Sequence, residues 1–209
     1  MPVIFGCTLI FIVLMRYYSR KQTKINTESA NELRLRELEA LTARKQDISG
    51  LPYMIADNNK LPVLPDASDE EATERLTKLK QMNGKQLLNL SNISNTDLRL
   101  TYGAANFLVL SACDTDYMNY TQELYRLGHR LHETGYPTEA LQVLTYALEL
   151  HTDIGNTYRL LGDIYASHQD QAALSALMQQ AEANLTELVL PPVLTYLKKL
   201  SSVSDHAPE

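Results

Sequence analysis

Residues 121–154 read TQELYRLGHRLHETGYPTEALQVLTYALELHTDI, and residues 155–188 read GNTYRLLGDIYASHQDQAALSALMQQAEANLTEL. Aligned end to end, these two stretches of 34 residues place large apolar, glycine and alanine residues at matching positions. Both have a Leu-Gly pair at the seventh and eighth positions, Leu127-Gly128 and Leu161-Gly162. Self-similarity at a fixed period is typical of proteins built from stacked repeats.

Each stretch contains two runs in which apolar residues recur every three or four positions, which predicts two amphipathic helices joined by a turn. Gly135 falls in the first turn, whereas the second turn, residues 167–170, has no glycine. Small residues at matching positions, including Gly128 and Gly162, would let two helices cross closely. The sequence therefore predicts two helical hairpins that pack on one another.

This pattern resembles the tetratricopeptide repeat (TPR) superfamily, with one repeat at about 121–154 and a second at about 155–188. The resemblance implies an all-α fold of stacked helical hairpins whose concave groove binds an extended or helical peptide. It also implies which first-helix residues line that groove. The predicted partner-binding residues are Gln122, Tyr125, Arg126, His129, His132, Asn156, Arg159 and Asp163.

Charge and motif content narrow the function classes. The chain has a net charge of -6, and residues 46–209 carry eleven basic against twenty-one acidic side chains, which argues against a nucleic-acid partner. No P-loop, GxGxxG or GxSxG motif occurs, so we expect no enzyme, no catalytic residues and no cofactor. His129, His132 and Glu133 share one helical face, but without a further ligand nearby we expect no metal site.

The N-terminal residues 1–15, MPVIFGCTLIFIVLM, contain no charge, and Arg16, Tyr17 and Tyr18 follow them. This pattern predicts a membrane anchor over residues 1–18, short but sufficient for a thin bilayer. Because the nearby positive charge comes after the apolar run, the positive-inside rule places the following residues in the cytoplasm. The expected fold class thus adds one transmembrane helix, and the expected localisation is single-pass membrane with a cytoplasmic soluble domain.

The segments outside the repeats show weaker signals. Residues 50–65 contain three prolines, which favour extended backbone. The apolar content of this segment favours a strap lying on the domain over a solvated linker. Residues 105–113, ANFLVLSAC, are expected to form buried core against the first repeat. The assignments are a basic juxtamembrane stalk helix at 19–49, a Pro-containing linker or strap at 50–65, a helical extension at 66–120, two TPR units at 121–188, a capping helix at 189–202 that begins near Pro191-Pro192, and a disordered tail at 203–209.

Two functions fit this organisation. The first is a membrane-tethered TPR adaptor that binds a protein or peptide partner at the cytoplasmic face of a membrane. The alternative is a self-associating structural or assembly protein, a homo-oligomer whose groove is filled by its own strap, residues 51–65, or by a second copy through the stalk helix. The sequence leaves the identity of the partner open.

Overall fold

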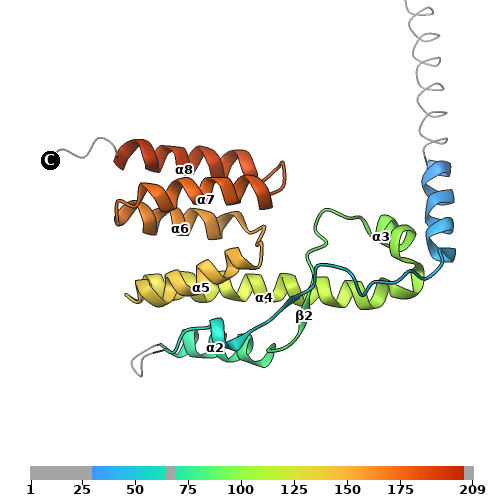
Figure 1. Ribbon diagram of the computed structural model, residues 1–209, viewed down its shortest axis with the longest axis horizontal. Helices are drawn as coiled ribbons and strands as arrows, with labels where there is room; N and C mark the ends of the chain where they lie inside the picture. The colour runs from blue at the N-terminus through green and yellow to red at the C-terminus, as the bar shows by residue number, and fades with distance from the viewer. Residues whose placement is uncertain (1–29, 65–68, 205–209) are drawn as a thin grey trace, which may run out of the picture. The chain divides into compact units, whose positions relative to one another are not determined.

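The computed structural model describes residues 30–64 and 69–204, and these are mostly helical, as the sequence predicts (Figure 1). A helix over residues 30–42 comes first. The elements after it are β1 (Met54–Ile55), η1 (Asn58–Lys60), α2 (Glu70–Gln81), β2 (Gln86–Leu87), α3 (Asn95–Tyr102), η2 (Ala104–Asn106), α4 (Phe107–Glu133), α5 (Pro137–Glu149), α6 (Gly155–Ser167), α7 (Gln171–Asn184) and α8 (Leu190–Ser204).

The expected transmembrane helix is corrected by the structure. Over residues 30–64 and 69–204, the helices are too short or too polar to cross a bilayer. The anchor predicted at residues 1–18 lies outside the described residues, as do residues 205–209 of the predicted tail. Over the described residues the fold class is all-α with no membrane-spanning helix, which corrects the expected fold class and the expected single-pass localisation for this part of the chain.

The chain divides into two compact units. The described part of the first unit comprises residues 30–50 and 93–108. In it, the segment after the 30–42 helix joins the end of α3 through two backbone hydrogen bonds, from Gln46 N to Tyr102 O (3.0 Å) and from Ala104 N to Ala43 O (3.2 Å). The buried side chain of Asn106 closes the same corner, because its Nδ2 donates to the Gln46 and Tyr102 carbonyls, each at 2.7 Å.

The second unit contains residues 51–92 and the chain from Val109 onward, and here the repeat helices stack. Figure 1 shows α5, α6, α7 and α8 following one another as layers. Gly128 of α4 lies against Leu144 of α5, and Gly162 of α6 lies against Leu197 of α8. A Cβ atom at Gly128 would stand 2.6 Å from the Leu144 side chain, so the close crossing inferred for this glycine from the sequence is confirmed.

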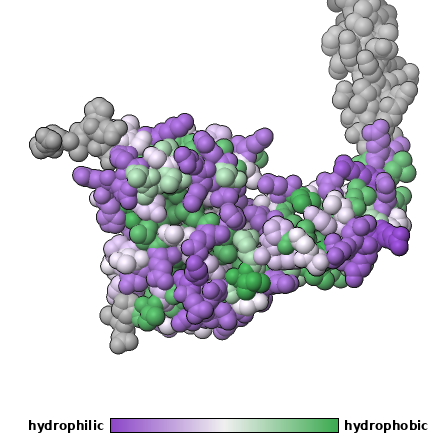
Figure 2. All heavy atoms as spheres, viewed as in Figure 1, coloured by the Kyte–Doolittle hydropathy of each residue, from purple (hydrophilic) through white to green (hydrophobic). Residues whose placement is uncertain are grey.

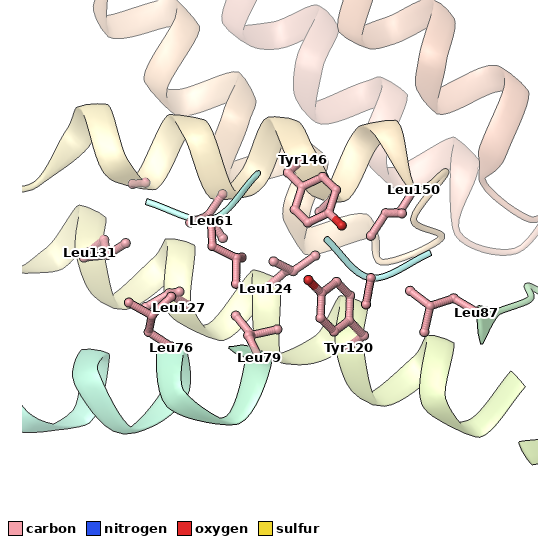
Figure 3. Packing of buried hydrophobic residues seen from close by; sticks show 14 of the residues in the cluster. Leu61, Leu76, Leu79, Leu87, Tyr120, Leu124, Leu127, Leu131, Tyr146 and Leu150 are labelled. Carbon is pink, nitrogen blue, oxygen red and sulfur yellow. The ribbon is translucent and has the colours of Figure 1, made fainter. Parts of the chain in front are cut away.

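Residues 51–92 complete the hydrophobic core beside α4. In this segment β1 pairs antiparallel with β2, and α2 lies along α4 with Leu76 and Leu79 buried. Figure 3 shows these leucines packing with Leu124 and Leu127 of α4 beneath Tyr146 of α5. The segment predicted as a linker or strap is therefore a strap over its described residues 51–64, since it contributes Ala56 and Leu61 to this core.

Three successive helices of the second unit end in the same way. After α4, α5 and α6 a residue adopts positive φ, namely Gly135 (86°), His151 (53°) and Gln169 (56°). The next residue's N–H then bonds back to a carbonyl five residues earlier, as in Tyr136 N to Leu131 O at 2.8 Å. This Schellman-type closure satisfies carbonyls that the helix end leaves free. Glycine is therefore not required for it in the second and third cases.

The positive φ of Gln169 leads to a stability prediction. A residue with a side chain is strained by about 1–2 kcal/mol in the left-handed region, whereas glycine is not. Because Gln169 is exposed, we expect Gln169→Gly to raise the unfolding free energy by about 0.5–1 kcal/mol, measured by urea denaturation. The exposed mid-helix Gln179 is the matched control, since glycine there should cost about 1 kcal/mol instead. Destabilisation by both changes would contradict the prediction.

The structure differs from the sequence prediction most at α4. It is one helix of 27 residues, and the predicted boundary between 66–120 and 121–188 falls inside it. The prediction that residues 105–113 form buried core is wrong for Leu108 and Val109, whose side chains are 78% and 53% exposed. Leu110 and Cys113, on the opposite side of the helix, are buried. Near Cys113 the helix meets the segment after β2, because Leu88 N donates a hydrogen bond to the Cys113 carbonyl at 3.3 Å.

Candidate partner-binding faces

The predicted groove residues come from the exposed side of α4 and α6. On α4, Tyr125 is half-buried against the hydrophobic cluster that α6, α7 and α8 build. Its ring centroid lies 5.9 Å from that of His129, one turn further along the helix. Gln122, one turn earlier, is also half-buried, whereas His129 and His132 are exposed. An aromatic ring held in place beside a polar ring is suited to binding a partner side chain.

On α6, Asp163 and Arg159 lie one turn apart and have different partners. Tyr196 of α8 donates a hydrogen bond from its hydroxyl to Asp163 Oδ1 at 2.6 Å. This bond, together with burial and the negative charge of Asp163, raises the pKa of Tyr196, and the positive charge of Arg159 opposes the rise. Arg159 Nη1 donates to Asn156 Oδ1 at 3.1 Å.

Sequence reasoning missed Tyr196, because it lies in the helix after the repeats and no repeat position marks it. Its only sequence signal is the Pro191-Pro192 start of α8, which puts Tyr196 on the second turn of that helix. We use the name α4–α6–α8 face for the side chains of Tyr125, His129, Arg159, Asp163 and Tyr196.

Arg126 does not join this set. Its Nη1 binds Glu123 at 2.7 Å, and Glu123 in turn binds Arg75 of α2 at 3.0 Å. Arg130, one turn beyond Arg126, binds Asp69 at the start of α2. Glu123 and Arg130 of α4 therefore hold α2 in place. Because residues 66–120 carry no repeat pattern, the position of α2 beside Arg126 could not be predicted from the sequence.

One of the two histidines of α4 lies beside a carboxylate. His129 Nδ1 lies 3.4 Å from Glu133 Oε2, and both side chains are about half exposed. Over residues 30–64 and 69–204, the side chains of His, Cys, Asp and Glu form no group of three that could hold a metal ion. His129, His132 and Glu133 are all exposed on the surface of α4.

The strap lies on a different side of the molecule from the predicted groove residues. Tyr146 Oη of α5 accepts a hydrogen bond from Asp57 N at 2.9 Å, and Gln142 Nε2 donates to Lys60 O at 3.2 Å. Lys60 also forms an ion pair with Glu149 at 2.9 Å. These contacts place the strap between α2, α4 and α5, so it leaves the α4–α6–α8 face uncovered.

Two cavities lie on the α5 side of the second unit. One of about 470 Å³ opens between α5 and α7, and one of about 360 Å³ opens between η1 and α5. Of the predicted groove residues, none lines either cavity. In the view of Figure 2, hydrophilic side chains cover most of the surface, and hydrophobic residues reach it in separate patches.

Comparisons with protein-family models, with curated proteins and with solved structures find no match for this chain. The TPR resemblance thus stays a prediction that rests on the residue pattern of 121–188 and on the hairpins that this stretch forms. The candidate site is likewise defined by geometry alone. Arg159, Asp163 and Tyr196 lie near one another at α6 and α8, and the rings of Tyr125 and His129 lie near each other on α4.

Proposed function

We propose that this chain is a TPR-like helical-repeat protein that binds a protein or peptide partner through its α4–α6–α8 face. The observation that carries the proposal is the way neighbouring side chains hold this face. Asp163 is fixed by the Tyr196 hydroxyl, and Tyr125 is anchored in the hydrophobic cluster. Side chains fixed before binding lose less conformational entropy when a partner arrives.

The chemistry of the face suits a peptide with both aromatic and charged groups. Tyr125 and Tyr196 offer apolar ring surface with a polar tip, and residues of this type dominate binding energy at protein interfaces. Arg159 donates a hydrogen bond to the neutral amide of Asn156, so its charge can also pair with a partner carboxylate. The strap supports the proposal, because its contacts go to α2, α4 and α5 instead of this face.

The proposal is tested by crosslinked co-purification with the full chain. We expect the double variant Tyr125→Ala plus Arg159→Ala to weaken capture of the partner by about tenfold or more, since a hot-spot truncation costs at least 1–2 kcal/mol. The matched control is Glu74→Ala plus Lys78→Ala, which removes an exposed ion pair of 2.8 Å on α2. An unchanged set of partners in the first variant would refute the proposed face.

Self-association is a second candidate, favoured by one observation in the first unit. Leu33, Leu35, Leu38 and Leu41 of the 30–42 helix are all between 56% and 66% exposed. Apolar side chains exposed along one helix mark a contact surface for another molecule. If that molecule is a second copy, sedimentation of the full chain will show a dimer that Leu38→Glu plus Leu41→Glu converts to monomer; a wild-type monomer would exclude this function.

A further inference from the structure

The 30–42 helix, blue in Figure 1, carries a regular row of exposed side chains. Asn31, Leu35, Leu38 and Thr42 follow one another at alternating steps of four and three residues, and all four are exposed. Side chains at these steps lie along one side of a helix, and they form the contact row when two helices pair as a coiled coil. We call these four residues the seam.

The rest of the first unit is attached to the other side of this helix. Ala40 is 1% exposed, and its position lies opposite the seam, because successive residues of a helix advance by about 100°. Arg36, one turn before Ala40, binds Asp97 of α3 at 2.5 Å. The contacts within the unit therefore use the side of the helix that a coiled coil leaves on the outside.

The charges beside the seam are complementary to a second copy of the same helix. Arg34 flanks one edge of the seam, and Glu32 and Glu39 flank the other. In a parallel pair, a residue on the first edge lies against the residue five positions later on the second edge of the partner helix. Arg34 of each copy would thus meet Glu39 of the other. In an antiparallel pair, Glu32 of one copy would face Glu39 of the other and repel it.

The seam residues determine the register and the strength of such a pair. Leu35 and Leu38 are 66% and 60% exposed, and pairing would bury each of them against the same residue of the second copy. A single asparagine in the seam, here Asn31, fixes the register of a coiled coil at some cost in stability. Because the helix is shorter than two heptads, we expect a weak pair with a dissociation constant in the micromolar range.

We propose that the 30–42 helix pairs with the same helix of a second copy as a short parallel coiled coil. The inference rests on the self-association put forward as the second function, and it adds the contact residues and the orientation. Its consequence concerns binding. A dimer carries two α4–α6–α8 faces, so it would hold a partner with two recognised segments more tightly than a monomer does.

Sedimentation of the full chain over a series of concentrations tests the charge pairing. Arg34→Glu and Glu39→Arg should each weaken dimerisation by about tenfold, because each change puts like charges together at both ion pairs. Combining the two changes restores opposite charges and should return the dissociation constant to within about threefold of the wild-type value. Leu33→Glu is the matched control: Leu33 is 56% exposed on the same helix but lies off the seam, so dimerisation should not change.

Circular dichroism checks that every variant keeps its helix content. A wild-type dimer that the charge reversals leave unchanged would overturn the coiled coil but not self-association, which Leu38→Glu plus Leu41→Glu tests independently. Tighter dimerisation of Glu39→Arg would overturn the parallel orientation, because this change removes the repulsion from Glu32 in an antiparallel pair. A wild-type monomer would exclude self-association and the coiled coil together. Capture of a partner by the α4–α6–α8 face is tested by other variants and does not depend on these outcomes.

Discussion

Replacing Leu124 with alanine is expected to lower the free energy of unfolding by about 2–5 kcal/mol, the range for removing a fully buried leucine. Leu124 is 0% exposed and lies at the centre of the cluster that joins the strap, α2, α4 and α5 (Figure 3). The removed methyl groups leave a cavity that four separate segments border. Because those segments also fix one another through Tyr146 and Lys60, the site can relax only partly, which favours the upper part of the range.

Urea denaturation of the full chain, followed by circular dichroism, measures this change. Met118→Ala is the matched control, because Met118 is on the same helix but 52% exposed. Its cost should stay within about 0.5 kcal/mol, as for most surface substitutions. Equal effects at the two positions would mean that α4 does not bury the face that the structure shows.

The same cluster explains how so short a repeat array is completed. Two hairpins are fewer than the three or more repeats that stacked architectures generally need. The structure adds α2 beside α4 and the strap above it, and Arg130 and Glu123 of α4 tie α2 in place. At the other end, α8 covers Gly162. The ends of the stack are therefore closed by segments that carry no repeat pattern.

Spacing alone was enough to predict the helices from α5 to α8. Each has apolar residues at helical intervals, and two of them begin at prolines, Pro137 of α5 and Pro191-Pro192 of α8. Proline is suited to the first turn because no helical hydrogen bond needs its missing N–H. Local signals of this kind do not depend on the rest of the fold, which is why they can be read from the chain.

Features that depend on distant contacts could not be predicted. The repeat spacing placed a boundary near residue 120, but α4 is one continuous helix from Phe107 to Glu133. Leu108 and Leu110 are the same residue type two positions apart, yet only Leu110 is buried. The N-cap of α3 is Ser94, whose side-chain oxygen accepts a hydrogen bond from Asp97 N at 3.1 Å.

The α4–α6–α8 face was likewise predictable from the sequence only in part. Repeat positions identified Tyr125, Arg159 and Asp163, whose side chains all lie on it. They did not identify Tyr196, which reaches Asp163 from the last helix. Arg126, which was predicted as a further cation for the partner, pairs with Glu123 of its own helix. A repeat position determines which side of a helix a residue occupies, but the neighbouring helices determine what it meets.

Replacing Gly103 with alanine is expected to have the largest effect in the first unit, about 3 kcal/mol or more. Its φ is +90° with ψ 145°, a conformation close to one that only glycine adopts readily. A Cβ atom there would also lie 2.5 Å from the Arg44 carbonyl oxygen and 2.6 Å from Lys45 Cα. Both are backbone atoms, so the clash is relieved only if the segment after the 30–42 helix moves away from α3.

Hydrogen exchange of the full chain locates that loss. In Gly103→Ala, the amides of Gln46 and Ala104 should lose protection, because their hydrogen bonds join the two segments that must separate. Gly84→Ala is the matched control: its φ is +76° but nothing lies within 4 Å of its Cβ position, so it should show strain of about 1 kcal/mol alone. If both variants cost the same, close backbone approach contributes nothing at Gly103, and its conformation alone explains the glycine.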